Sequence, residues 1–591
     1  MSALKPAYLS RYCVSNISST CVHRFGQSFA LTLSLNQRLR CRNLCISRQY
    51  SSGRNCDSSP GHDPQYREFY KYTGGRWLWD EEKHFRLRYR EFNVHALQQI
   101  AVEAVGANRC EHISKVTDGG YNKVFRLVMD NGVVAIASLP YLIDGFPAYY
   151  STSSTAATME FVRTILGIPV PKVLAWDANG DNPVGAEYIL AEEAKGTRLN
   201  DAWPNMELRD RVATIEDLVS IHKKLLSVTF NRYGSLYFSS CPIKRSSAEV
   251  KGLISPAVQR DVMDGFTFGP TAREDFWFKE RAKMDINRGP WQTAIEYSLA
   301  VGQREIDWMN QYPNLREIDI DSDCPPTDDI LSSKAHLSVL DKYMRIAPLL
   351  LPKDPELVAS YLWHPFLHGE NVFLEGNRIS GIVGWQHAWA GPLFTEASPP
   401  AFVKINGDEL TLEYPDNYKD LEEDKRREIE QNVSQSVLRY AYQEFVSKDV
   451  PQLGKLFAFD FQQVRIYPIR LCVNSWGTND ITRFRESLMK IQRRWDFLGL
   501  EGPIPYKFSD DELKGQADKA ERFNKSEDFL DQISHLVNRS GWTSNSTYPQ
   551  VVKIFAEIGR EVLQAGDVDE STRAEFQQFI DRESEIEGET K

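Results

Sequence analysis

The spacing of apolar residues changes its period along the chain, and this change constrains the fold more than any other feature. Between residues 112 and 191 the apolar residues form short strand-like runs, and turn sequences at 118–120 and 130–132 separate the first three of them. A helical spacing appears at 158–165 and again from Leu208 onward, where only one hairpin, around 371–384, interrupts it. Strands are expected at 112–117, 123–129, 133–139, 170–176 and 184–191. The pattern predicts an α+β fold with two lobes, an antiparallel-sheet N-lobe followed by a mostly helical C-lobe.

The first residues have the composition of a targeting segment. Residues 1–56 contain eight Lys or Arg and no acidic residue, and Asp57 is the first acid. Arg-rich, Ser-rich and acid-free openings are typical of mitochondrial presequences. Arg48 precedes a Tyr50/Ser51 junction and resembles a matrix-processing site. A presequence over 1–50 and a matrix location are therefore predicted, with a disordered basic tail as the alternative.

The remaining composition argues against several classes of protein. No apolar run approaches the roughly 18–20 residues of a membrane-spanning helix, so no transmembrane segment is expected. The net charge is −11 and the body lacks a basic block, which argues against nucleic acid as a partner. Beyond the leader, Cys110, Cys241, Cys324 and Cys472 are widely scattered, so neither a disulfide framework nor a zinc site is indicated.

One loop has the spacing of a phosphotransferase catalytic loop, His-x-Asp-x-x-x-x-Asn. His364 and Asn371 occupy the outer positions of this frame, but Phe366 stands where the acid belongs. The metal-binding strand that follows such a loop corresponds to residues 382–386, where Gly384 stands at the position of a metal-binding Asp. Phosphoryl transfer needs positioning and charge stabilisation, which a phenyl ring and a glycine cannot supply.

Two other features of these segments have ordinary structural interpretations. Gly119 and Gly120 lie between two strands, where a phosphate-covering turn belongs, but taken by themselves they favour an ordinary hairpin turn. His364 and His368 have the i, i+4 spacing of a metal-ligand pair. Pro365 argues against a regular helix there, and the loop-structuring interpretation is favoured.

Together these segments resemble the aminoglycoside phosphotransferase / choline-kinase-like family, and within it a fungal mitochondrial branch. The resemblance extends over roughly residues 66–505 and implies a protein-kinase-like bilobal fold. The blocks that carry it are 72–78, 119–125, 166–176, 182–189, 233–237 and 285–291.

The resemblance assigns four degenerate positions. Phe366 replaces the catalytic base and Gly384 the magnesium-binding Asp. In the third strand Ser138 occupies the position of the phosphate-binding cation, and Thr155 that of the helix Glu that pairs with it. Asn371 matches the remaining metal-binding position. Loss of a general base alone typically costs ~10²–10⁴ in rate.

Two functions follow from this comparison. The first is a mitochondrial pseudokinase that acts as a binding or scaffold protein for a small molecule or a protein. The alternative is an active ATP-dependent small-molecule phosphotransferase with a relocated metal ligand, for which Glu370 is the leading candidate and His368 and Asp118 are the others. ATP and magnesium are implied as cofactors only by this alternative.

The expected organisation is a presequence at 1–50, an N-terminal extension at 51–95, a kinase-like N-lobe at 96–195, a helical C-lobe at 196–505 and a charged helical tail at 506–591. The tail is a candidate partner-binding arm. Its alternative is a solvated helical face packed on the C-lobe.

Overall fold

The computed structural model describes residues 64–589 except 142, 144–146, 313–332, 404–409, 460, 474–480, 517–532, 535, 539 and 565–569. The predicted presequence, its processing site and Cys324 lie outside the described residues.

The N-lobe is built on a five-stranded antiparallel sheet with the order β2-β3-β4-β6-β5. One face of the sheet is covered by α5 (Val94–Val105), whose first turn is capped by the Asn93 side chain, which accepts a hydrogen bond from the Ala96 amide. The strands are β2 (Cys110–Asp118), β3 (Asn122–Met129), β4 (Val134–Pro140), β5 (Val173–Asp177) and β6 (Tyr188–Glu192). All five lie where the sequence pattern predicted strands.

Alternation along β3 and β4 decides which side chains face the cleft. Phe125 and Leu127 of β3 and Ala137 of β4 are buried in the core beneath α5. Because successive side chains of a strand point to opposite faces, Ser138 lies on the other face of the sheet. There it lies near α6 (Ala148–Thr164), which contacts both β5 and the C-lobe strand β9 (Ser235–Phe238).

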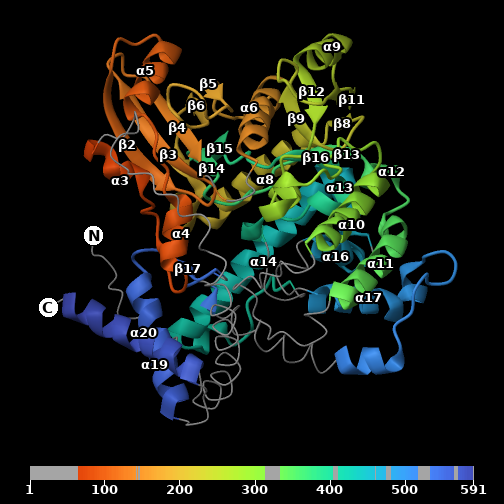
Figure 1. Ribbon diagram of the computed structural model, residues 1–591. Coiled ribbons are helices and arrows are strands. Elements are labelled where there is room, and N and C mark those ends of the chain that lie inside the picture. The colour runs from red at the N-terminus through yellow and green to blue at the C-terminus, as the bar shows by residue number, and fades with distance from the viewer. Residues whose placement is uncertain are drawn as a thin grey trace.

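The C-lobe is mostly helical (Figure 1), and its helices pack around one large apolar core. Its longest helix is α14 (Glu423–Asp449), which packs against α8 (Leu208–Leu225). The other main helices are α10 (Ala294–Gln311), α11 (Ser333–Leu350), α15 (Pro451–Phe457), α16 (Gln462–Cys472) and α17 (Ile481–Arg493). Tyr506 and Phe508 belong to this core. The predicted α+β organisation, with an antiparallel-sheet N-lobe followed by a mostly helical C-lobe, is confirmed.

The prediction of a single hairpin in the C-lobe was wrong. The expected hairpin is present as β14 (Val372–Glu375) and β15 (Arg378–Ile382), with β7 (Thr197–Arg198) added to its edge. Two further sheets were missed, because strands of two to four residues are too short to show a period of two. They comprise β10 (Ser246–Ser247), β12 (Phe266–Gly269) and β9, and β11 (Val250–Gly252), β8 (Val228–Phe230), β13 (Ser360–Trp363) and β16 (Trp389–Pro392).

Segments from the two ends of the described chain meet below the N-lobe (Figure 1). The N-terminal segment contains α3 (Arg67–Tyr70), β1 (Arg76–Trp77) and α4 (Glu81–Arg88), and β1 pairs with β17 (Trp542–Thr543). The C-terminal helices α19 (Tyr548–Gln564) and α20 (Glu570–Glu589) form a small core with Leu78. None of the described helices is long and apolar enough to cross a bilayer.

Candidate functional site

The catalytic-loop frame begins where β13 ends, and His364 fixes its shape. The His364 Nε2 atom lies 2.9 Å from the Val383 carbonyl, and the Phe366 amide donates to Nδ1 at 3.2 Å. Since Nδ1 accepts, the ring is neutral and Nε2–H donates to Val383. Burial lowers the pKa of His364 to about 4, in keeping with a neutral ring. His364 therefore ties the loop to the segment that carries Gly384.

Asn371 and Gly384 are brought into contact. The Asn371 Nδ2 group donates to the Phe366 carbonyl at 2.8 Å, and the Val383 amide donates to the Asn371 carbonyl at 2.9 Å. Gly384 has a φ of +85°, and a Cβ at this position would lie 2.5 Å from Asn371 Nδ2. The Asn371 side chain thus occupies the space that an Asp at 384 would need.

Of the other proposed metal ligands, Glu370 and Asp118 are paired with other residues, whereas His368 lies beside Asn371. The Glu370 carboxylate accepts from Asn200 Nδ2 at 2.6 Å and lies 3.8 Å from Arg198. His368 is exposed, and its Nε2 atom lies 3.4 Å from Asn371 Nδ2. Asp118 is buried against Lys123 and Lys115, at 3.0 and 3.1 Å.

The two N-lobe positions that the family resemblance assigns as degenerate both lie beside a very small void. Ser138 and Thr155 both line it, together with Asn122 and Gln386, and its volume is about 20 Å³. Asn122 Nδ2 donates to the Ser138 hydroxyl. A void needs roughly 10–15 Å³ to hold one water, whereas small-molecule pockets measure about 300–1,000 Å³. The space between these two positions therefore holds about one water and no small molecule.

Gly119 and Gly120 form the turn between β2 and β3, but neither has a positive φ. The Gly119 amide donates to the Asn122 carbonyl at 2.8 Å. The residue after them, Tyr121, reaches from this turn to the catalytic loop. Its ring lies 5.8 Å from that of Phe366 and 4.8 Å from that of His387, measured between centroids. Phe366 thus supplies an apolar contact to the turn at the place of the base.

A large cavity of about 690 Å³ opens beside Phe366. Tyr121, which also lines the small void, forms one wall, and aromatic rings from the C-lobe form much of the rest. Burial raises the pKa of Glu274 and of Tyr121, whose side chains are hydrogen-bonded to each other. The lining residues used below are Tyr121, His222, Arg273, Glu274, Asp275, Trp363, Phe366, Trp389 and Glu396.

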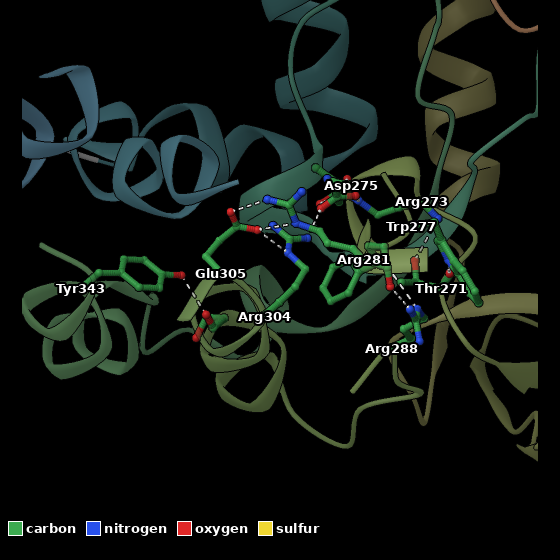
Figure 2. A network of polar contacts seen from close by, with 12 residues as sticks. Thr271, Arg273, Asp275, Trp277, Arg281, Arg288, Arg304, Glu305 and Tyr343 are labelled. Atoms are coloured by element: carbon green, nitrogen blue, oxygen red, sulfur yellow. Dashed lines mark hydrogen bonds and ion pairs between the residues drawn. The ribbon is translucent and has the colours of Figure 1, made fainter. Parts of the chain in front are cut away.

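The acidic wall of this cavity is neutralised by arginines (Figure 2). Arg273 contacts Asp275 at 3.1 Å and Glu396 at 3.2 Å, and Arg304 contacts Asp275 at 3.0 Å. Burial opposes ionisation of Asp275, but the two guanidinium groups lower its pKa to about 2. Behind this wall, Glu305 is buried between Arg304 and Arg281, at 2.8 and 2.7 Å. The cavity therefore presents rings and paired charges.

A magnesium-bound nucleoside triphosphate does not fit the residues present. Asn371 is retained, but Gly384 adds no carboxylate, and Ser138 adds no cation to a closed void. In the part of the chain that the structure describes, no three His, Cys, Asp or Glu side chains are grouped closely enough to hold a metal ion. Of the residues that line the large cavity, the sequence singled out His364, Phe366 and His368 but not Tyr121 or the C-lobe residues Arg273, Glu274 and Glu396, although the position of Tyr121 after two glycines was a usable signal.

Comparison with known proteins agrees with the resemblance seen in the sequence. The chain is 27% identical over 504 residues to a subtelomeric hrmA-associated cluster protein of Aspergillus fumigatus, covering 78% of this chain and 94% of that protein. It is 24% identical over 520 residues to Altered inheritance of mitochondria protein 9, mitochondrial, of Yarrowia lipolytica, covering 83% and 87%. The predicted resemblance is confirmed, and several relatives are named as mitochondrial proteins.

No protein-family model matches the chain. The solved structure of a thermostable aminoglycoside phosphotransferase in its apo form aligns with 67% of this chain and 99% of its own, at 13% identity and a TM-score of 0.33. That score is too low for the alignment to support any inference about this chain.

Proposed function

We propose that this protein is a mitochondrial kinase-like binding protein that is catalytically impaired as a phosphotransferase and takes a small molecule in the cavity beside Phe366. One observation supports the proposal: the void between Ser138 and Thr155, where the phosphate-binding cation and its partner are expected, measures about 20 Å³, while the neighbouring cavity measures about 690 Å³. The second volume is within the range of small-molecule pockets and the first is not.

The losses at the site reinforce one another physically. With Ser138 in place of a cation and Gly384 in place of a carboxylate, neither triphosphate nor magnesium would be held. Phe366 cannot accept a proton from an attacking hydroxyl. Its ring instead packs near Tyr121, which favours a closed turn over an open nucleotide site.

The matrix location is part of the proposal. The acid-free leader and the mitochondrial names of several relatives support it. Import of a reporter fused to residues 1–60, followed by protease protection in swollen mitochondria, tests it. Accumulation outside the matrix would contradict this part alone.

The catalytic part is tested with the purified chain and ATP, with and without magnesium. Thermal unfolding is expected to shift by less than the assay error at millimolar nucleotide. Transfer or hydrolysis of the γ-phosphate is expected to stay far below the ~1–100 s⁻¹ typical of kinases. Magnesium-dependent turnover in that range, abolished by Asn371→Ala, would overturn the proposal in favour of an active phosphotransferase.

The binding part is tested by a small-molecule thermal-shift screen. A ligand present at 100 times its Kd stabilises the folded state by ~2.7 kcal/mol. Hits that use the cavity should lose their effect in Glu274→Gln and keep it in Glu280→Gln, a substitution outside the cavity lining. Hits that respond to neither change, or an empty screen with a broad library, would count against a binding role for this cavity.

A further inference from the structure

The C-terminal segment packs against the N-terminal segment through a shared apolar cluster. We call the described residues between 533 and 589, which include β17, α19 and α20, the C-terminal module. Leu78 is buried in its core with Phe555 and Phe579, and Trp79 packs on the same cluster. The apolar side of α19 is therefore covered within the chain.

Backbone and side-chain contacts fix the register of this docking. Trp77 pairs with Trp542 and Arg76 with Thr543 between β1 and β17. The Leu78 amide donates to the Gly541 carbonyl at 2.9 Å, and Arg582 donates to the Leu78 carbonyl at 2.7 Å.

Two glycines make the close approach of these strands feasible. A Cβ on Gly75 would lie 2.5 Å from the Thr543 carbonyl oxygen, and one on Gly541 would lie 2.6 Å from the Trp79 ring. Gly541 also has a φ of +79°, which favours glycine. The docking geometry is thus built into the sequence of both segments.

The module then contacts the residues that hold the glycine turn. Trp542 Nε1 donates to the Tyr72 hydroxyl at 2.8 Å, and Asn545 Nδ2 donates to the Thr73 carbonyl at 2.9 Å. Thr73 in turn donates to the Asp118 carboxylate from its amide at 2.7 Å and from its hydroxyl at 2.9 Å.

Asp118 is the anchor of the turn, because it directly precedes Gly119 and Gly120. Lys123 and Lys115 each donate a hydrogen bond to the Asp118 carboxylate. Each also donates to the Lys71 carbonyl, at a distance of 2.6 Å. The same buried group therefore joins the start of the turn to the segment on which the module docks.

The far end of the turn carries Tyr121 to the cavity. Its carbonyl accepts from the Tyr141 amide at 2.9 Å, and the Tyr141 hydroxyl lies 3.3 Å from Asp118. Tyr121 lines both the large cavity and the small void, and it packs near Phe366. A continuous path runs from Trp542 and Asn545 through Thr73 and Asp118 to Tyr121.

We infer that the C-terminal module is an intramolecular clamp on the 118–121 turn. While the module is docked, the turn holds Tyr121 in the wall of the cavity. When the module undocks, the turn releases Tyr121 and the cavity opens. This regulation rests on the proposed binding site. The clamp itself is independent of any ligand, since it concerns contacts within the chain. Its strand pairing spans only two residues on each side, so the module is suited to local release without loss of the lobes.

Hydrogen exchange of the full chain, followed by mass spectrometry, tests the clamp without a ligand. In Trp542→Phe/Asn545→Ala the two side-chain donors are lost while a ring remains in place. Exchange in peptides covering 117–123 is expected to rise at least tenfold, together with that of 541–546, while C-lobe peptides stay unchanged. The matched control is Trp495→Phe, which removes an indole donor to the Gly502 carbonyl in the C-lobe.

A second variant approaches the turn from the other side. Thr73→Val removes the hydroxyl donor to Asp118 and keeps the amide donor, so it is expected to raise exchange at 117–123 and to leave that of α19 unchanged. If the module variant loosens 541–546 and leaves 117–123 at the wild-type rate, the clamp is disproved. The same result leaves the proposed binding function intact, since that function is judged by ligand shifts and nucleotide turnover.

Discussion

Asn371 lies in the space that a side chain on Gly384 would need: a Cβ there would be 2.5 Å from Asn371 Nδ2. An Asp at position 384, which the family resemblance expects, would therefore require a local rearrangement. The Asn371 side chain is held in this space because its Nδ2 group donates to the Phe366 carbonyl at 2.8 Å. Restoring the acid requires the displacement of Asn371 and a strained backbone at a φ of +85°.

Gly384→Asp is expected to lower the free energy of unfolding by about 2–3 kcal/mol, from a left-handed backbone and a displaced hydrogen bond. Urea denaturation measures the loss. Gly376→Asp is the control, because Gly376 has a φ of +64° and nothing lies within 4 Å of its Cβ position. It should lose only the part of the unfolding free energy that comes from the left-handed backbone. Equal losses in the two variants would show that Asn371 does not obstruct position 384.

Phe366→Asp/Gly384→Asp is expected to show no gain of ATP hydrolysis, because the void between Ser138 and Thr155 still measures about 20 Å³ and Ser138 still replaces the cation. A coupled assay of phosphate release checks this with and without magnesium. Hydrolysis at kinase-like rates would mean that the void opens for nucleotide, contrary to the small void described above.

His222→Phe is expected to make the protein less sensitive to acid. His222 is fully buried against Trp363, and neither ring nitrogen has a hydrogen-bond partner among the described residues. Burial lowers its pKa from 6.5 to about 3, so between these pH values the unfolded chain binds a proton that the folded chain does not. The stability therefore falls as the pH falls through this window, by about 2 kcal/mol between pH 7 and pH 5.

Urea midpoints of wild type and His222→Phe at both pH values measure this contribution. The variant should lose about 2 kcal/mol less than wild type over the interval. His112→Phe removes an exposed imidazole on β2 and serves as the control. An unchanged pH slope in His222→Phe would contradict the assignment of a buried neutral ring.

Glu305→Gln is expected to destabilise the protein by about 3–5 kcal/mol, because it leaves Arg281 and Arg304 buried beside an uncharged amide. Both guanidinium groups are about 1% exposed and the carboxylate is fully buried. Thermal unfolding measures the change, and Glu296→Gln on the exposed side of the same helix is the control. A loss below 1 kcal/mol would show that the network in Figure 2 contributes little to folding.

Asp118→Asn is expected to cost a similar ~3–5 kcal/mol, because Lys123 remains buried without its partner charge. Burial by itself would raise the pKa of Asp118, but Lys123 and Lys115 hold it below its usual value. The stability from this pair is therefore present above pH ~3.8 and is lost as the pH falls through the lower folded-state pKa. In the variant this acid dependence should be absent.

The control for Asp118→Asn is Glu193→Gln, directly after β6 of the same sheet, which breaks an exposed pair with Arg126. Exposed pairs contribute about 0–1 kcal/mol, so this change should be nearly neutral. Losses of equal size in the two variants would contradict the burial argument.

The sequence predicted the features that depend on local pattern. Short apolar runs, such as those that contain Phe125 and Ala137, were enough to place the N-lobe strands because turn residues separate them. The short C-lobe strands were missed, since β13 and β16 are held by pairing between segments distant in sequence. The residues of β13, Ser360 to Trp363, have no periodic pattern of apolar side chains of their own.

The absence of acids at Phe366 and Gly384 is a prediction of the sequence and its family resemblance, because it depends only on residue type and spacing. Only the tertiary structure decided what replaced that chemistry. The Asn371 amide beside Gly384, the void between Ser138 and Thr155, and the docking of Trp542 on Tyr72 all join segments that are far apart along the chain or lie on different elements. Contacts of this kind follow from packing and close approach in three dimensions, which no local pattern of residues encodes.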